Sequence, residues 1–370
     1  MMKKKRVFHI ISHFDVGGAE RVAVNIAKSD NPEIEYHVVE LIRARSSFTQ
    51  TFVEELREAG IKYHRFIVPG IRFHYLFERM AALLFPLWFV FIYYRYKPDV
   101  IHSHTEMPDL AVYHFFRLFP WCRKCCKVVR TIHNTRLWEG LPATGRRVEK
   151  FMIGCRANVA ISASVQENYH REYGELAPII FNGIAPVEQQ PYPHLKPGKQ
   201  NILFAARFEQ QKGIGTLIEI IKALQDDHRY HFHLFGDGSL KKQAEQSLSQ
   251  CANVSIHPPL YGVSRFMQSF QYMIMPSEFE GLSILSIEAS FNGLPVIINS
   301  CPGLRDTLPA DWPLQVSGNS LEQYMELFRH RLPDVNRDAL CGQALQFVDS
   351  RFGVHQMRRR YEAIYLEPRE

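Results

Sequence analysis

The sequence predicts an α/β protein of two domains, each built on a doubly wound parallel sheet. With 370 residues, the chain exceeds the size at which a single hydrophobic core usually stops growing. Short apolar runs such as residues 7–11 and 202–206 alternate along it with segments of helical spacing. Residues 272–298 read as a buried strand, a helix and a second buried strand, and this succession is typical of a parallel sheet.

The first domain is expected over residues 1–185. A helix is predicted over residues 48–59, between strands of the same domain. The apolar run 71–96 is predicted not to span a membrane, because its uncharged part, residues 80–94, is shorter than the roughly 20 residues that a spanning helix needs. Strands are predicted at residues 7–11, 36–42, 63–68, 98–104, 128–132 and 159–162, and residues 179–184 close the domain.

A linker and a second domain follow. Four prolines within residues 186–197 indicate a linker over residues 186–198, and the second domain is expected over residues 199–353. Its predicted strands are 202–206, 231–235, 254–257, 272–275 and 296–298, and its predicted helices are 216–224, 262–270 and 283–291. Asn292, Gly293 and Pro295 end the last of these helices.

Composition narrows the class of protein. A content of 46% apolar and 22% charged residues is that of an ordinary globular protein. Residues 1–190 carry 26 basic and 19 acidic side chains, an excess of seven positive charges, whereas residues 191–370 carry 18 and 19. A basic first half indicates an anionic partner or surface. Seven cysteines without a second paired cluster favour free thiols in a reducing cytosol, and the interrupted apolar run after residue 6 predicts no export.

Two carboxylates mark a candidate binding site in residues 272–298. Glu280 lies at a turn from strand to helix, and Glu288 lies eight residues later inside the helix. Eight helical residues rise about 12 Å and return to within about 80° of the same face, a separation that suits a nucleotide sugar. The backbone amides of Gly281, Leu282 and Ser283 would then face the phosphates from a helix N-terminus. The alternative is an amphipathic helix with two solvated glutamates.

These residues resemble a known family. Ser277-x-x-Glu280-Gly281, followed by Glu288 and by Gly-Leu-Pro-Val-Ile at residues 293–297, is similar to the signature of glycosyltransferase family 4. Members of that family are retaining enzymes that use nucleotide sugars and have the GT-B fold, two Rossmann-like domains that face each other across a cleft. The resemblance extends over nearly the whole chain. It implies that Glu280 is a catalytic residue and that Glu288 binds the donor.

Further motifs match the same family. Arg207-x4-Lys212-Gly213 follows the strand 202–206, and the resemblance implies that both cations hold the diphosphate of the donor. Gly17 and Gly18 lie in a Gly-Gly-Ala-Glu-Arg turn, which in the family lines the cleft near the donor. The turn also lacks the third glycine of a dinucleotide-binding fingerprint, and a nicotinamide-dependent oxidoreductase is therefore disfavoured.

Three other parts of the chain fit the resemblance. Gly236 and Gly238 form a turn like the one that lies near the nucleotide in the family, although a plain turn from strand to helix explains them equally well. His102 and His104 end a strand at the carboxyl edge of the first sheet, and the resemblance implies that His104 is a catalytic residue beside the donor sugar. Residues 354–370 are amphipathic, and in GT-B proteins the last helix packs on the first domain.

The expected activity is transfer of a hexosyl group from a nucleotide sugar, a UDP-sugar rather than a GDP-sugar, to a glycan or lipid-linked acceptor in cell-surface polysaccharide biosynthesis. No Asp-x-Asp triplet occurs, and we expect transfer without a metal ion and without a cofactor other than the donor. Retention by attack on the same face and by a covalent intermediate both remain open. The alternative function is a non-catalytic nucleotide-sugar-binding protein or an inactive partner subunit.

Location is the last expectation. We expect a cytoplasmic protein with no nucleic-acid partner that binds the inner face of an anionic membrane through its first domain. The aromatic run 83–94 and a basic cluster, Arg123, Lys124, Lys127 and Arg130, suggest this surface. The alternative is that the run packs against the sheet.

Overall fold

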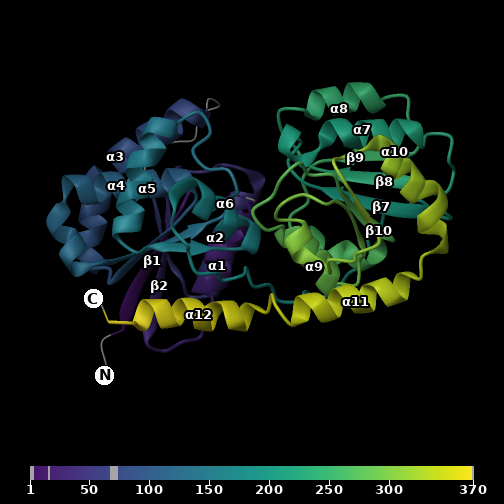
Figure 1. Cartoon of the computed structure of the whole chain (residues 1–370). Helices are drawn as coiled ribbons and strands as arrows, with labels where there is room; N and C mark the ends of the chain where they lie inside the picture. Colours follow the sequence, from purple (N-terminus) through teal and green to yellow (C-terminus); the bar gives the residue numbers. More distant parts are fainter. Residues whose placement is uncertain (1–3, 16, 67–73, 369–370) are drawn as a thin grey trace. The chain divides into compact units, whose positions relative to one another are not determined.

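The computed structural model describes residues 4–15, 17–66 and 74–368. The chain divides into two compact units, of which the first comprises Met1–Gly183 with Val354–Glu370 and the second comprises Ile184–Gly353. Each unit contains one six-stranded sheet with helices around it (Figure 1). All strand pairs in both sheets are parallel.

The sheet of the first unit has the strand order β3-β2-β1-β4-β5-β6. Its strands are β1 (Lys5–Ile11), β2 (Ile34–Glu40), β3 (Lys62–Arg65), β4 (Val100–His104), β5 (Lys127–Ile132) and β6 (Asn158–Ala160). The order reverses between β1 and β4, where Val7 pairs with Tyr36 on one side and Val100 on the other. Open sheets of this kind bind ligands outside the carboxyl ends of their strands near such a reversal.

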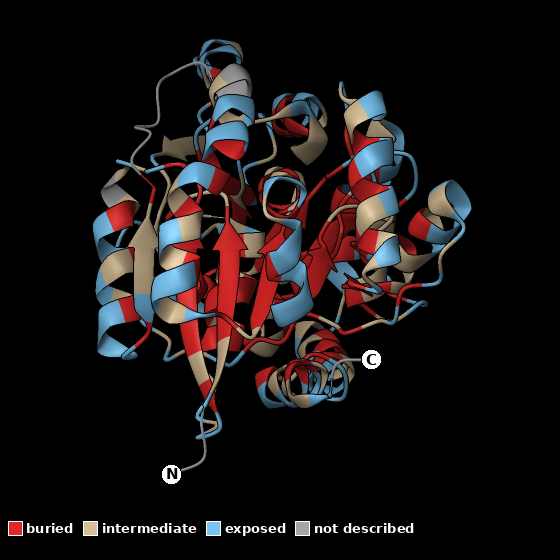
Figure 2. Cartoon of the chain, turned by 90° about the vertical axis from the view of Figure 1, so that its left-hand side faces the viewer, coloured by how far each residue is buried: buried red, intermediate tan, exposed pale blue. Residues whose placement is uncertain are grey.

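Helices cover this sheet. They are α1 (Gly18–Ala27), α2 (Ser47–Glu58), α3 (His74–Tyr96), α4 (Glu106–Leu118), α5 (Pro142–Gly154), α6 (Ala163–Tyr173) and α12 (Val354–Leu366). Side-chain caps start two of them, since Ser46 forms a capping box with Thr49 at α2 and Ser162 accepts a hydrogen bond from the Val165 amide at α6. In Figure 2 the strands of this sheet are largely buried, and the helices around them carry the exposed residues.

The last helix, α12, belongs to the first unit. Tyr361 and Tyr365 on α12 are fully buried, and their hydroxyl groups lie 2.8 Å from Thr131 Oγ1 and 2.7 Å from His102 Nδ1. Arg358 Nε donates to the carbonyl oxygen of Asn25 at 2.7 Å. The helix therefore adds buried side chains and polar contacts to the centre of the first sheet.

Helix α3 packs on the unit with one face and leaves the other exposed. Phe85 and Phe89 are fully buried, and α3 packs along α4. The opposite face exposes Met80, Leu83, Leu84, Leu87, Phe91 and Tyr94. Its stretch Phe77–Tyr96 is long and apolar enough to cross a membrane by length and composition, and 33% of its most apolar window is buried. Packing against the rest of the unit and exposure of an apolar surface were alternatives from the sequence. The structure has both, on opposite faces of α3.

The sheet of the second unit has the strand order β12-β11-β10-β7-β8-β9. Its strands are β7 (Gln200–Ala205), β8 (Tyr230–Phe235), β9 (Val254–His257), β10 (Tyr272–Met275), β11 (Val296–Asn299) and β12 (Gln315–Val316). Its helices are α7 (Ile214–Ala223), α8 (Lys241–Leu248), α9 (Ile284–Phe291), α10 (Leu321–Glu326) and α11 (Arg337–Asp349). If β7 to β12 are renumbered 1 to 6, the order read from the β9 edge is 3-2-1-4-5-6, the same as in the first unit. This match confirms the prediction of two doubly wound sheets.

Two segments of the second unit differ from simple expectation. Residues 263–269 form a 3-10 helix rather than an α-helix, and Gly262 precedes it with a φ of 70°. Residues 184–198 pack on this unit: Tyr192 is part of its hydrophobic core, and Gln189 Nε2 donates to Ser264 O at 2.9 Å and to Asn292 Oδ1 at 2.8 Å. The proline-rich segment is therefore anchored along much of its length.

Candidate functional site

An ion pair lies at the carboxyl edge of the second sheet. Lys212 ends a short turn after β7, and Glu280 follows β10, 68 residues later. Lys212 Nζ lies 2.6 Å from Glu280 Oε1 and 2.8 Å from Oε2, and the Ser277 hydroxyl donates to Oε1 at 2.9 Å. Glu280 is only 7% exposed. Two predicted site residues are thus in direct contact, and Ser277 supports the carboxylate.

Gly213 lets the loops after β7 and β10 approach each other. It has a φ of 69°, and a Cβ atom at this position would lie 1.9 Å from the carbonyl oxygen of Pro276. Any other residue would collide with backbone there, in a conformation that L side chains rarely adopt. Gln211 Nε2 donates to Phe279 O at 3.1 Å, and the Glu278 amide donates to Gln211 O at 2.8 Å. These contacts fix Lys212 beside Glu280.

Gly236 and Gly238 have a packing role. A Cβ at Gly236 would lie 2.1 Å from Ala206 O, and a Cβ at Gly238, whose φ is 156°, would lie 2.6 Å from Phe208 O. The Phe208 amide donates to Asp237 O at 2.8 Å. The turn after β8 therefore holds the loop after β7 at close range, which positions the segment that carries Arg207.

Arg207 is an accessible cation of this edge. Its side chain is exposed, and it has no hydrogen-bond or ion-pair partner among the residues that the structure describes. Lys212, in contrast, is neutralised by Glu280. An anion that approaches Arg207 and Lys212 meets an unpaired guanidinium group and an ammonium group that already has a carboxylate partner.

The start of α9 is only partly as predicted. The helix begins at Ile284, and Ser283 is its N-cap residue, with a hydroxyl that accepts from the Ser286 amide at 3.4 Å. The Ser283 amide itself donates to Gly303 O at 3.4 Å, so this amide has an internal partner. Gly281 and Leu282 are buried next to it, and Glu288 is half-buried within the helix. The proposed contacts of these residues with a donor stay predictions.

A chain of three buried histidines reaches the carboxyl edge of the first sheet. His9 Nδ1 lies 3.0 Å from His104 Nε2, and His104 Nδ1 lies 3.1 Å from His133 Nε2. Burial lowers the pKa of His9 and of His133 to about 3 and the pKa of His104 well below its usual range, so the three rings are neutral. Both nitrogens of His104 are engaged and the ring is fully buried, whereas His133 lies nearest the surface. His133 directly follows the predicted strand 128–132, but only His104 was predicted as a catalytic histidine.

The histidines also form a group with the spacing of metal ligands. His9, His102 and His104 each offer a ring nitrogen within 4.8 Å of the others, and His9 Nε2 has no hydrogen-bond partner among the residues that are described. His102, however, is held by Tyr365 OH and by Thr131 Oγ1, both at 2.7 Å. A metal ion would need the lone pair of a His102 ring nitrogen, and both nitrogens of that ring already have hydroxyl partners. The three histidines therefore fit a hydrogen-bonded network better than a metal site.

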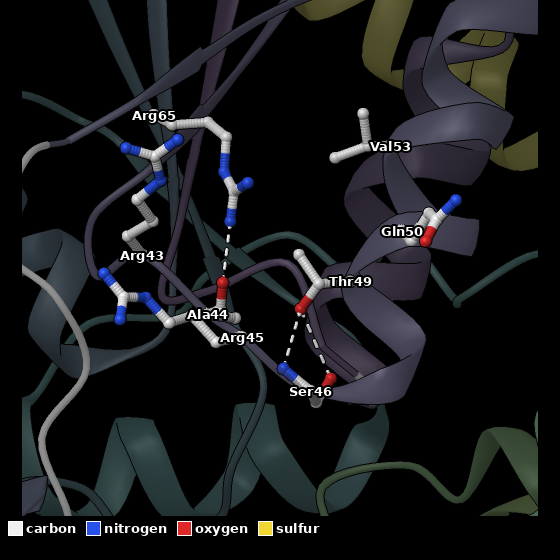
Figure 3. A pocket seen from close by; sticks show the side chains of 8 residues that line it. All are labelled: Arg43, Ala44, Arg45, Ser46, Thr49, Gln50, Val53 and Arg65. Atoms are coloured by element: carbon white, nitrogen blue, oxygen red, sulfur yellow. Dashed lines mark hydrogen bonds between the residues drawn. The ribbon is translucent and has the colours of Figure 1, made fainter.

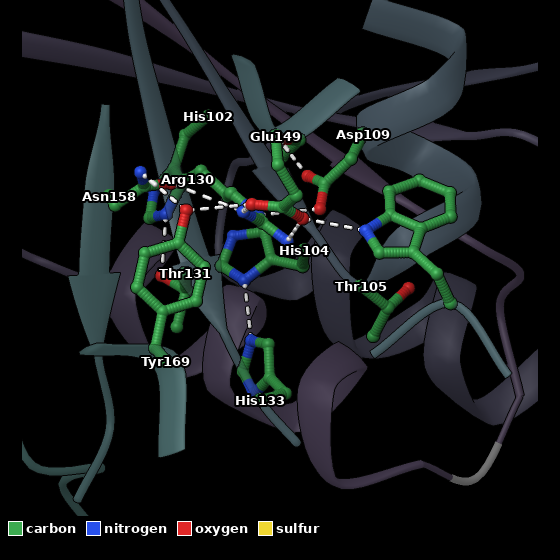
Figure 4. A network of polar contacts seen from close by, with 12 residues as sticks. His102, His104, Thr105, Asp109, Arg130, Thr131, His133, Glu149, Asn158 and Tyr169 are labelled. Atoms are coloured by element: carbon green, nitrogen blue, oxygen red, sulfur yellow. Dashed lines mark hydrogen bonds and ion pairs between the residues drawn. The ribbon is translucent and has the colours of Figure 1, made fainter. Parts of the chain in front are cut away.

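Arg130 anchors a buried network beneath this edge (Figure 4). Its Nε donates to Asp109 Oδ2 at 2.7 Å, and its two terminal nitrogens donate to the Glu149 carboxylate at 2.6 and 2.8 Å. Trp138 Nε1 donates to Glu149 Oε1 at 2.6 Å, which ties the loop after β5 to α5. The expectation that Arg130 belongs to a basic surface cluster is wrong, because its side chain is 1% exposed and paired with carboxylates inside the unit.

The glycine turn of the first unit precedes α1. Gly17 is the N-cap residue of that helix and Gly18 is its first residue, while Val16 lies outside the described residues. Glu20 is buried nearby, and its carboxylate lies 3.7 Å from His13 Nδ1. Of the predicted site residues, Gly17, Gly18 and His104 therefore belong to the first unit and the others to the second.

Known proteins resemble the chain over most of its length. Residues 16–188 match the family described as Glycosyltransferase Family 4, and residues 199–325 match the family described as Glycosyl transferases group 1. An uncharacterised 41.2 kDa protein in the cps region of Klebsiella pneumoniae is 24% identical over 57% of this chain, and the match spans 63% of that protein, less than two thirds. The capsular polysaccharide biosynthesis glycosyltransferase CapH of Staphylococcus aureus is 22% identical over 79% of this chain and 80% of its own length.

Solved structures share the fold. The structure of Anabaena Alr3699/HepE in complex with UDP and glucose superposes with a TM-score of 0.76, at 16% identity, over 97% of this chain and 98% of that one. This similarity confirms the predicted GT-B fold. The two family matches follow each other along the sequence and together span most of the chain, and they show that it belongs to glycosyltransferase family 4, the glycosyl transferases of group 1.

Proposed function

We propose that this protein transfers a hexosyl group from a UDP-sugar to a glycan or lipid-linked glycan acceptor, with retention of configuration and without a divalent metal, during the synthesis of a cell-surface polysaccharide. The observation that carries the proposal is the carboxyl edge of the second sheet, where Lys212, Glu280 and the unpaired Arg207 gather after neighbouring strands. Two cations and one carboxylate match the diphosphate and the hydroxyl groups of a sugar nucleotide.

The relatives support the donor and the pathway. HepE, whose fold this chain shares, has been crystallised with UDP and glucose, and CapH is named as a glycosyltransferase of capsular polysaccharide biosynthesis. A UDP-sugar donor and a polysaccharide product are therefore the first candidates for this chain.

Charge stabilisation explains transfer without metal. As the bond between the anomeric carbon and the diphosphate breaks, negative charge grows on the departing phosphate oxygens. Arg207 and Lys212 are cationic donors at this edge, and Lys212 is held in place by Glu280. In same-face attack, the leaving phosphate oxygen accepts the proton of the acceptor hydroxyl as the new glycosidic bond forms. A covalent route needs a protein nucleophile beside the anomeric carbon, and inversion at two successive steps would give the same stereochemistry.

His133 is an additional candidate for contact with the sugar. It is the outermost member of the buried histidine chain and follows β5 at the carboxyl edge. His104 supports it from behind through the 3.1 Å contact. We therefore assign His104 to positioning rather than to direct contact, and the variant His133→Ala is expected to lower kcat more than donor affinity.

Turnover tests the proposal against its alternative. Donor binding is measured first, by thermal unfolding of the protein with UDP-glucose, UDP-galactose, UDP-N-acetylglucosamine and the matching GDP-sugars. A donor present at 100 times its Kd raises the free energy of unfolding by about 2.7 kcal/mol. Release of UDP in the presence of cell-envelope glycolipid extract supports transfer. Binding of a UDP-sugar without release under any acceptor would support a non-catalytic binding protein, and no binding of any sugar nucleotide would refute both.

We also propose a cytoplasmic location with reversible attachment to an anionic membrane through the exposed face of α3. Phe91 is 74% exposed and Leu83 is 60% exposed on this face, and Trp121 Nε1 donates to Tyr94 OH at 2.9 Å at its end. Exposed apolar and aromatic side chains of this kind insert into the interfacial region of a bilayer. Arg123 and Lys124 follow Trp121 in the sequence and supply positive charge for anionic lipids.

A further inference from the structure

A pocket in the first unit contains three arginines that the donor site does not use. It has a volume of about 550 Å³ and lies where β2 and β3 end (Figure 3). Arg43 and Arg45 come from the segment after β2, and Arg65 is the last residue of β3. Figure 3 shows the three guanidinium groups opposite Thr49 and Gln50 of α2. Pockets of this size hold small-molecule groups.

Arg65 is fixed in position. Its Nε donates to Glu40 Oε2 at 2.5 Å, and its Nη2 donates to Ala44 O at 2.8 Å. Glu40 is fully buried, and the guanidinium carbon of Arg65 lies 5.5 Å from the centre of the Phe14 ring. Glu40 therefore neutralises Arg65 and holds it as a rigid wall of the pocket.

Arg43 and Arg45 are not neutralised. Both side chains are exposed, and neither has a hydrogen bond or an ion pair in the described part of the chain. The carboxylate of Asp15, on the same side of the unit, accepts from the Ser46 hydroxyl at 3.0 Å. Ser46 also caps α2, whose N-terminus adds a partial positive charge to the same side of the pocket. The pocket thus has an excess of positive charge.

We propose that this pocket binds an oxyanion of the acceptor, either a phosphate or diphosphate group or the carboxylate of an acidic sugar. The proposal rests on the proposed function and adds to it the chemical class of the acceptor. Arginine presents planar pairs of N–H donors that match such oxyanions in two-point contacts. The pocket is at the carboxyl edge of its sheet, where open α/β sheets bind ligands, and it belongs to the first unit, whereas the predicted diphosphate-binding cations belong to the second.

Methyl NMR of the full-length protein tests this. Ala44 and Val53 line the pocket, and their ¹³C-labelled methyl groups report binding there and not at the second unit. Inorganic pyrophosphate, glucuronate and glucose are titrated separately at low salt. We expect saturable shifts of these methyl signals with an anion and none with glucose, and weaker binding as salt is added. Stronger binding of pyrophosphate indicates a phosphate-bearing acceptor, and stronger binding of glucuronate indicates an acidic sugar.

Paired variants complete the test. Arg43→Ser/Arg45→Ser should lower anion affinity about tenfold or more, because charge-assisted hydrogen bonds are lost. The control Arg171→Ser/Arg359→Ser removes two exposed charges of the same unit outside the pocket and should bind as the wild type does. Absence of shifts at Ala44 and Val53 with both anions, or equal affinity in the pocket variant, overturns the proposal. Neither result depends on sugar-nucleotide turnover, which separately decides the proposed function.

Discussion

The variant Lys212→Met separates the structural role of the ion pair from its role in donor binding. Lys212 makes two contacts of 2.6 and 2.8 Å with Glu280, and without it the Ser277 hydroxyl is the one hydrogen-bond donor left to that carboxylate in the described parts of the chain. Removing one member of a buried ion pair costs about 3–5 kcal/mol because the other charge stays buried. The side chain of Lys212 is 18% exposed, so we expect the lower end, about 3 kcal/mol.

The double variant Lys212→Met/Glu280→Gln removes both charges. The introduced amide would keep a hydrogen bond to Ser277, and we expect most of the stability to return, to within about 1 kcal/mol of the wild type. Affinity for UDP should return only in part, because Glu280→Gln removes a charge that repels phosphates but does not replace the lost ammonium group. If Lys212 contacts the diphosphate, both variants lose a charge-assisted hydrogen bond worth about 1.5–3 kcal/mol, or roughly tenfold or more in Kd.

Two measurements check this. Hydrogen exchange of the β10 amides reports the stability of the second unit by itself, which matters because the chain has two units. Calorimetry with UDP reports donor affinity. Lys222→Met is the matched control, because Lys222 is an exposed lysine on α7 in the same unit. If UDP binds the single variant as well as the wild type, or if the double variant regains full affinity, Lys212 has only a structural role.

Three further predictions concern pH, metal and membrane. Burial lowers the pKa of His9 to about 3, so below pH 6.5 the unfolded chain binds a proton at His9 that the folded chain does not. The free energy of unfolding of the first unit should therefore fall as the pH falls below 6.5. In denaturation series at several pH values, His9→Leu should reduce the slope of this free energy against pH by up to about 1.4 kcal/mol per pH unit. UDP release should persist in EDTA; loss that magnesium or manganese restores would contradict metal-free transfer. Leu87→Ser/Phe91→Ser should reduce sedimentation with anionic vesicles and the control Leu176→Ser should not; sedimentation of both variants equal to that of the wild type would refute attachment through α3.

Much of the fold follows from local patterns. Buried strands of parallel sheets are continuous apolar runs, and helix ends carry capping residues, so two doubly wound sheets could be expected from alternating elements. Helix α9 lies within one residue of its expected start because Ser283 is a strong N-cap and Asn292 and Gly293 end the helix. The 3-10 form of residues 263–269 could not be predicted, because the residue spacing of so short a segment does not distinguish an α-helix from a 3-10 helix.

Contacts between distant residues could not be read from spacing. Lys212 and Glu280 are 68 residues apart, and His9 and His104 are 95 apart; parallel strands bring them together only when the sheet forms. A count of charges along the sequence also assigns to the surface a charged residue that is in fact buried with its partners. Arg130 is such a residue, because its two carboxylate partners lie 21 and 19 residues away in the sequence. The arginine pocket is a third case, because Arg65 joins Arg43 and Arg45 only through the pairing of β2 with β3.

If the donor binds here as proposed, the pairing of Lys212 with Glu280 determines how this edge of the sheet interacts with it. A sugar nucleotide brings negative charge to a place where the ammonium group already has a carboxylate partner, so its phosphates compete with Glu280 rather than fill a vacant positive site. Two unit charges 4 Å apart attract by about 4 kcal/mol at an effective dielectric constant of about 20, and the Glu280 charge repels a phosphate on the same scale. Arg207, which has no carboxylate partner in the described part of the chain, therefore supplies the uncompensated attraction, while Glu280 is available to accept hydrogen bonds from hydroxyl groups. We therefore expect this edge to bind a sugar nucleotide, whose hydroxyl groups can donate to the carboxylate, in preference to a bare diphosphate, which meets only the repulsion of Glu280.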